Sequence, residues 1–192
     1  MQPLIIVPGW RGSGSAHWQT HWERELRHAT RIDVSDWNAP RCDDWLRALD
    51  DAIATADAPP ILVAHSLGCV AVAHWAASAA HAVRGALLVA PPDLDRAACP
   101  EVLRDFGPVP RARLPFSVHV IASDDDPHAA LDRVRQMADD WGAELTVLHR
   151  AGHINVESGF GPWHEGRRWL DALATAPLVH AQDPRRRFAA HK

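Results

Sequence analysis

The chain has 192 residues, 47% of them hydrophobic and 23% charged, with a formal net charge of −4 at pH 7. This length suits one domain with a well-buried core, and the weak negative charge gives no reason to expect nucleic acid or an anionic membrane as a partner. The first residues hold no basic segment and only a short apolar run before Pro8, which indicates a strand rather than a signal peptide or membrane span. We expect a cytoplasmic protein, a monomer or weak homodimer, whose substrate is a small molecule.

Six apolar segments alternate with stretches of helical periodicity along the chain. The segments expected to form strands are residues 3–8, 31–34, 61–63, 83–90, 116–122 and 144–148. Helices are predicted after the glycine-rich loop 9–15, over residues 43–55, after residue 66, and over 129–141 and 161–174. Four prolines and little periodicity between residues 93 and 115 predict a surface excursion, with a short helix near 100–106, that is too small for a large lid.

This alternation predicts a single α/β domain, residues 1–175, on a doubly wound and mostly parallel six-stranded sheet. Each crossover between parallel strands must bury its apolar helix stripe against the sheet, so helices are expected on both faces. Residues 176–192 are basic and irregular and are expected to form a poorly ordered tail. Because function gathers at the carboxyl ends of such strands, the residues that follow each strand are the candidates for chemistry.

The third predicted strand leads into the segment Ala64-His65-Ser66-Leu67-Gly68 and then into a helix. This segment fits the nucleophile elbow Gly-x-Ser-x-Gly with alanine at the first glycine position. Small residues are needed on either side of the serine, because the sharp turn brings strand and helix close together. Alanine is small enough, and Gly68 keeps the second position. Ser66 is therefore the candidate nucleophile.

An acid and a base follow the fifth and sixth strands. Asp124, Asp125 and Asp126 come after the fifth, and His153 comes after the sixth, so the chain order is Ser, Asp, His, as the elbow of an α/β hydrolase requires. A serine hydroxyl needs a neutral imidazole to take its proton, and the imidazole needs a carboxylate to fix its tautomer. We expect Ser66, Asp126 and His153 to form this triad.

The choice among the acids leaves alternatives. Asp126 is preferred because the residue before Pro127 lies past the strand end, where the loop can turn back toward the histidine. Asp124 and Asp125 are then interpreted as solvated loop carboxylates or charges at a helix N-terminus, and Asp93 is a weaker rival. Nearby histidines are interpreted as surface or strand-face residues: His128, His149 and His164.

The oxyanion hole needs two backbone N–H groups directed at the developing negative charge. The expected donors are Leu67, directly after the nucleophile, and Trp10 in the glycine-rich loop. That loop lacks the spacing of a nucleotide-binding loop. His17, His21 and Glu25 lie four apart on one helix and could bind zinc, but such a stripe is more often a half-exposed helix face, so neither a metal nor a cofactor is expected.

These motifs together resemble the small serine-hydrolase family that includes retinoblastoma-binding protein 9, over roughly residues 3–173. The segments that carry the resemblance are Pro8-Gly9-Trp10, His17-Trp18-Gln19, Trp37, the elbow at 64–68, Ser123 to Pro127, Gly152 to Asn155, Gly159-Phe160-Gly161 and Trp163. The resemblance implies a minimal α/β-hydrolase fold without a large cap, strand order 2-1-3-4-5-6, and a triad of Ser66, Asp126 and His153. Ala64 and the C-terminal tail depart from the family pattern without affecting the triad.

The sequence therefore predicts a serine hydrolase, carboxylesterase-like, that cleaves a small ester, thioester or amide through an acyl-enzyme. The same triad could serve an acyltransferase or a carbon–carbon bond hydrolase, and a binding or scaffold protein on a hydrolase fold is the alternative from another class. A complete triad favours catalysis, because a binding module has no need for three matched groups at three strand ends. The indoles expected to line the substrate pocket are those of Trp10, Trp18, Trp37 and Trp163.

Overall fold

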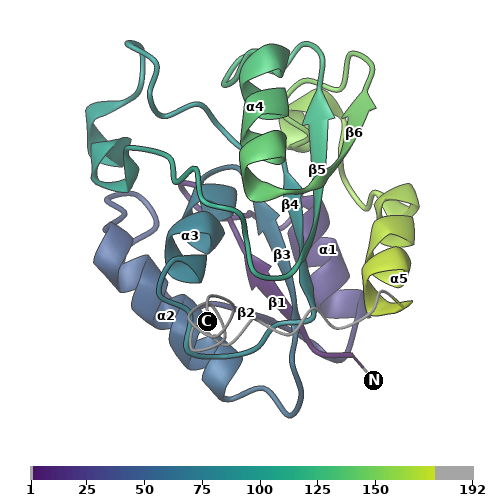
Figure 1. Ribbon diagram of the computed structural model, residues 1–192. Coiled ribbons are helices and arrows are strands. Elements are labelled where there is room, and N and C mark those ends of the chain that lie inside the picture. The colour runs from purple at the N-terminus through teal and green to yellow at the C-terminus, as the bar shows by residue number, and fades with distance from the viewer. Residues whose placement is uncertain (1, 176–192) are drawn as a thin grey trace, which may run out of the picture.

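Six parallel strands form the centre of the computed structural model, which describes residues 2–175 (Figure 1). The strands are β1 (Leu4–Val7), β2 (Ala29–Arg31), β3 (Ile61–His65), β4 (Gly85–Val89), β5 (Ser117–Ser123) and β6 (Glu144–Leu148). Their order in the sheet is β2-β1-β3-β4-β5-β6, with every neighbouring pair parallel. The α/β class and the strand order are thus confirmed, whereas the tail predicted at 176–192 lies outside the described residues.

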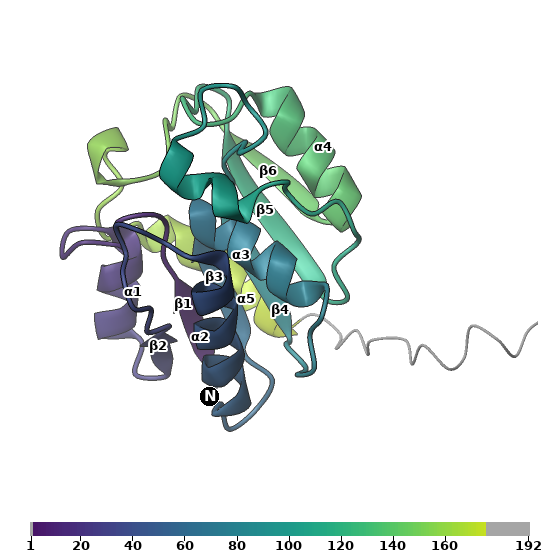
Figure 2. The ribbon, with the colours of Figure 1, turned by 90° about the vertical axis from the view of Figure 1, so that its left-hand side faces the viewer.

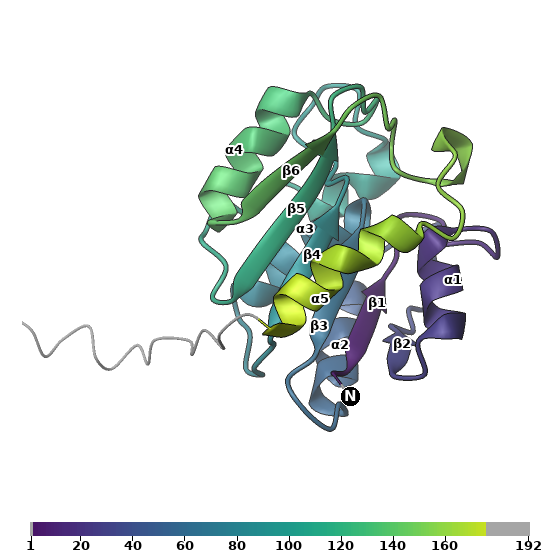
Figure 3. The ribbon, with the colours of Figure 1, turned by 90° about the vertical axis from the view of Figure 1, so that its right-hand side faces the viewer.

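Helices cover both faces of this sheet (Figures 2 and 3). One face carries α1 (Trp18–Glu25) and α5 (Arg168–Thr175), and the other carries α2 (Cys42–Ala54), α3 (Leu67–Ala76) and α4 (Leu131–Trp141). Successive side chains of a strand point to opposite faces, so Ile5 and Val7 join the core beneath α2, α3 and α4 while Leu4 and Ile6 join the core beneath α1 and α5. Within residues 2–175, none of these helices is both long and apolar enough to cross a membrane.

Two predicted elements differ from those observed. The second strand is Ala29–Arg31, paired with β1 from Leu4↔Ala29, rather than residues 31–34. Arg31 pairs with Ile6, and the N–H of Ile32 still donates to the Ile6 carbonyl at 3.1 Å, whereas Val34 is buried after the strand has ended. The closing helix begins later than residue 161, as a 3₁₀ turn at His164–Arg167 followed by α5, because Trp163 has a φ of 39° and cannot continue a right-handed helix.

The proline-rich excursion after β4 is only partly a surface feature. It contains the predicted short helix as a 3₁₀ turn, η1 (Glu101–Phe106). Leu103 and Phe106 of this turn are buried, so the excursion packs onto the domain beside α2 and α3 (Figure 2). It thereby supplies one side of a cavity at the carboxyl ends of the strands.

Candidate active site

Ser66 occupies the sharp turn between β3 and α3. Its φ of 53° and ψ of −124° lie outside the common regions for a residue with a side chain, as expected at a nucleophile elbow. Its backbone N–H donates to the carbonyl of Val89 at 2.9 Å, which ties the turn to β4. A Cβ on Gly68 would lie 2.3 Å from the carbonyl oxygen of Val7, so only glycine allows α3 to start this close to β1.

The structure brings Ser66, His153 and Asp126 into one chain of hydrogen bonds. His153 Nε2 lies 2.9 Å from Ser66 Oγ, and His153 Nδ1 lies 2.8 and 3.0 Å from the two carboxylate oxygens of Asp126. Because an ionised carboxylate only accepts, Nδ1 carries the proton and Nε2 is left to accept from the serine hydroxyl. The Asp126 side chain is 3% exposed and that of His153 10% exposed. Asp93, the weaker rival, instead pairs with Arg133 at 3.3 Å.

The other two aspartates of the acidic run do not reach the imidazole. Asp124 accepts from the backbone N–H of Arg150, and Asp125 accepts from that of Gly152, both at 2.7 Å. Hydrogen bonding lowers the pKa of both carboxyls, with the Arg150 N–H as the main cause at Asp124 and the Ser123 hydroxyl at Asp125. Both are exposed loop carboxylates, as expected, and in addition both hold the loop that leads to the histidine.

Three further contacts fix the backbone around His153, and the sequence reasoning missed them. The Nε2–H of His65 donates to the carbonyl of His153 at 2.9 Å, and the N–H of His153 donates to Ser158 Oγ at 3.1 Å. The next residue, Ile154, accepts from the indole N–H of Trp18 at 2.9 Å. Burial lowers the pKa of His65 well below its ordinary value, so this ring stays neutral. Nothing in the sequence signals these long-range contacts.

The two backbone donors expected to form the oxyanion hole have no acceptor within residues 2–175. They are the N–H groups of Trp10 and Leu67, on either side of the nucleophile turn. Gln19, another residue that the sequence reasoning missed, is fully buried beneath them. Its amide donates to the carbonyls of Val7 at 3.2 Å and Val63 at 3.0 Å, so it joins the ends of β1 and β3, from which the two donors extend.

The helical stripe considered for zinc is engaged in other contacts. His17 is buried and its Nδ1 accepts the N–H of Gln19 at 3.2 Å, which caps α1. Burial lowers the pKa of His17 to about 4, with the Arg31 charge as the next cause. Glu25 forms an ion pair with Arg167. Among the described residues, no three histidine, cysteine or acidic side chains converge into a group that could hold a metal ion.

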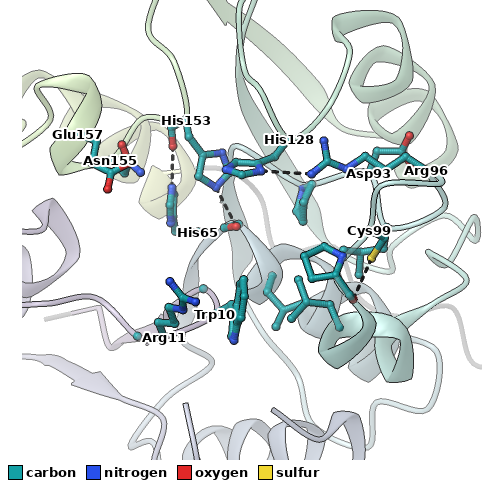
Figure 4. A pocket seen from close by; sticks show the side chains of 18 of the residues that line it. Trp10, Arg11, His65, Asp93, Arg96, Cys99, His128, His153, Asn155 and Glu157 are labelled. Carbon is teal, nitrogen blue, oxygen red and sulfur yellow. Dashed lines mark hydrogen bonds between the residues drawn. The ribbon is translucent and has the colours of Figure 1, made fainter. Parts of the chain in front are cut away.

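A cavity of about 360 Å³ opens above Ser66 (Figure 4). Trp10 is the one tryptophan among the described residues that line it. Trp18 and Trp163 instead pack on each other at 5.3 Å between ring centres, and Trp37 packs on Trp45 at the same distance. The prediction that these three indoles wall the pocket is wrong, because their rings fill the spaces beneath the loops. One side of the cavity is lined by Pro92 and residues of the excursion that follows it: Asp93, Leu94, Arg96, Cys99, Pro100 and Leu103.

His128 is exposed, as its interpretation as a surface residue predicted, and it also lines this cavity. Its ring centre lies 4.4 Å from that of His153, and its backbone N–H donates to Asp126 Oδ1 at 2.8 Å. His149 does lie at the surface, where it contacts Asp124 at 2.6 Å, and His164 begins the 3₁₀ turn before α5. The His128 ring thus stands beside the candidate base.

The comparisons with known proteins agree with this arrangement. A family model described as serine hydrolase matches residues 4–172. A solved protein described as YdeN-like, from Pectobacterium atrosepticum, is 32% identical over 91% of each chain, with a TM-score of 0.81. The ydeN gene product of B. subtilis is 23% identical over 92% of this chain and 100% of its own, with a TM-score of 0.75.

More distant structures share the fold alone. The α/β hydrolase domain-containing protein 10 from mouse is 15% identical over 90% of this chain and 89% of its own, with a TM-score of 0.70. No curated protein matched the sequence. The family match therefore identifies no subgroup of serine hydrolases. The narrower resemblance to the group that includes retinoblastoma-binding protein 9 stays a prediction.

Proposed function

The chain belongs to the serine hydrolase family, and from this we propose that it hydrolyses a small ester, thioester or amide through an acyl-enzyme on Ser66. The observation that carries the proposal is the continuous set of hydrogen bonds from Ser66 Oγ through His153 to Asp126, at 2.9 and 2.8 Å, beside the cavity. A carboxylesterase-like activity on a small acyl substrate fits a cavity of about 360 Å³.

The proposed acylation moves one proton and exchanges one bond. Ser66 Oγ attacks the substrate carbonyl carbon while its proton passes to His153 Nε2, and the carbonyl becomes an oxyanion that accepts from the N–H groups of Trp10 and Leu67. When this intermediate collapses, the bond to the leaving group breaks and His153 gives its proton to the leaving atom. Asp126 keeps the imidazole in the required tautomer and stabilises its charged form.

Deacylation repeats these steps with water. A water molecule attacks the acyl carbon and gives its proton to His153, which then returns a proton to Ser66 Oγ as the carboxylic acid leaves. Within the protein, His153 Nε2 and Ser66 Oγ are the two atoms that gain and lose a proton in this cycle.

Pre-steady-state hydrolysis of p-nitrophenyl acetate tests the proposal. A burst of p-nitrophenol close to one equivalent of enzyme is expected, because the acyl-enzyme forms faster than water removes it. Ser66→Ala should show no burst and lose turnover by about 10⁵-fold. A binding protein on this fold would show neither burst nor turnover in the wild type, and turnover that survives in Ser66→Ala would overturn the assignment of the nucleophile.

A further inference from the structure

Arg96 is a charged residue of the cavity that the proposed chemistry leaves unused. Its guanidinium donates to the carbonyl of Pro127 at 2.8 Å and approaches Nδ1 of His128 at 3.4 Å. Both acceptors are neutral, and a guanidinium has five N–H donors. Three donors therefore remain for a ligand at this side of the cavity.

The carboxylates nearest to Arg96 in the sequence are bound by another arginine. Asp93 and Asp95 pair with Arg133 at 3.3 and 2.6 Å. Among residues 2–175, Arg96 itself forms no ion pair. No direct contact thus compensates its positive charge. Arg96 is half-buried, so solvent and salt would screen its attraction to an anion less than on an open surface.

His128 extends this site toward the candidate base. Because an arginine can only donate, the contact with Arg96 makes His128 Nδ1 an acceptor and leaves the ring proton on Nε2. Burial, and then the charge of His153, lowers the pKa of His128, which favours this neutral form. The rings of His128 and His153 are 4.4 Å apart between centres. Arg96, His128 and His153 therefore form a row along one side of the cavity, from the excursion to the candidate base (Figure 4).

The side of the cavity lined by Arg96, His128 and His153 is where a leaving group would lie. In acyl transfer His153 must give its Nε2 proton to the leaving atom, so that atom departs beside His153, whereas the oxyanion turns toward the backbone of Trp10 and Leu67. We propose that Arg96, with His128 beside it, binds a carboxylate carried by the leaving group of the substrate. The inference rests on the proposed function and adds the class of substrate.

The donors of Arg96 and His128 fit a carboxylate. A guanidinium offers two parallel N–H donors that match the two oxygens of a carboxylate, and the N–H of His128 adds one more. The opposite side of the cavity has mixed charge, since Glu157 lies beyond His153 and Arg11 stacks on the Trp10 ring at 4.3 Å (Figure 4). Arg11 is exposed, so it is the rival cation to be tested.

Two acetate esters of nearly equal shape provide the test: 3-carboxyphenyl acetate and 3-carbamoylphenyl acetate. The readout is the ratio of their kcat/KM values, in which any effect on the shared chemistry cancels. Arg96→Gln should lower this ratio at least tenfold relative to wild type, and Arg96→Lys should keep part of it, because lysine retains the charge without the paired donors. Arg104→Gln is the matched control, since Arg104 pairs with Glu101 at 2.9 Å and does not line the cavity.

Each outcome decides the matter. A ratio that falls in Arg96→Gln and is kept in Arg11→Gln and Arg104→Gln supports the assignment. A ratio that is unchanged in Arg96→Gln, or that falls as far in Arg11→Gln, overturns it while both esters are still hydrolysed through Ser66. Failure of the wild type to hydrolyse either ester would instead overturn the proposed function, and this inference with it.

Discussion

Two walls of the cavity are built in different ways. The strand-end wall (Gly9, Trp10, Ser66, Leu67 and His153) is made of backbone turns held by buried polar contacts. The excursion wall (Pro92, Leu94, Arg96, Cys99, Pro100 and Leu103) is made of side chains from a proline-rich segment with one 3₁₀ turn. In the proposed function, the first wall holds the reacting groups and the second contributes further contacts with the substrate.

This difference separates reactivity from preference. A substitution in the strand-end wall should lower turnover of every substrate, because it moves the groups that make and break bonds. A substitution in the excursion wall should change which substrate is preferred, because it alters the shape or charge of the pocket. Substitutions in each wall test whether reactivity and substrate preference are independent.

The largest effect is expected for the carboxylate behind His153. Asp126→Asn should lower kcat by about 10⁴-fold, as in the serine-protease precedent, because the amide no longer selects the tautomer in which Nε2 accepts. Steady-state kinetics on several esters measures it, and all of them should fall together. Asp124→Asn is the matched control and should stay within about tenfold, since its amide oxygen can still accept from Arg150. Near-normal turnover in Asp126→Asn would show that another acid serves His153.

The next effect concerns the pH dependence of stability. The pKa of His17 falls from 6.5 to about 4 on folding, so the folded state prefers the neutral ring. The stability that this ring contributes is complete above pH 6.5 and is lost as the pH falls toward 4. Between pH 7.5 and 5 the wild type should lose about 2 kcal/mol more than His17→Asn, which keeps an N-cap acceptor.

Urea unfolding at the two pH values measures this loss. His21→Asn, one turn further along the same helix, is the control and should behave as the wild type does. If His17→Asn lost as much stability on acidification as the wild type, the His17 ring would already be solvated, which would contradict its burial beneath the cavity.

The smallest effect belongs to the excursion wall. Leu103 is 7% exposed and lines the cavity. Leu103→Ala should open room for a longer acyl chain and raise the ratio of kcat/KM for hexanoate over acetate esters about three- to tenfold, at about 0.8 kcal/mol per buried methylene. Val102→Ala, on the exposed side of the same turn, should leave the ratio unchanged. An equal fall for both esters in Leu103→Ala would mean that this wall also controls reactivity.

The sequence predicted most accurately what depends on local geometry. The position of Ser66 in the elbow follows from small residues and a strand-to-helix change, and the place of Asp126 before Pro127 follows from where β5 must end. The spacing of apolar residues likewise predicted which helix faces are buried, because this spacing is also a local pattern. Local patterns therefore located the reacting groups.

Contacts between distant segments could not be predicted in this way. The direction in which Trp18 or Trp163 points depends on how α1, α5 and the His153 loop meet. Gln19 joins β1 and β3 through two bonds, one of which reaches Val63, 44 residues further along the chain. The apolar pattern at 31–34 extended past the residues that bond to β1, because the apolar side chain of Val34, beyond the end of this edge strand, is buried in the core without sheet pairing.

The central claim is that one serine, held between a base and two backbone donors, carries the acyl group. The most direct measurement is the mass of the intact, active protein after reaction with a fluorophosphonate, followed by mapping of the labelled peptide. We expect a single adduct, on Ser66, with complete loss of esterase activity. An adduct on another residue, or active protein that resists the reagent in large excess, would contradict it.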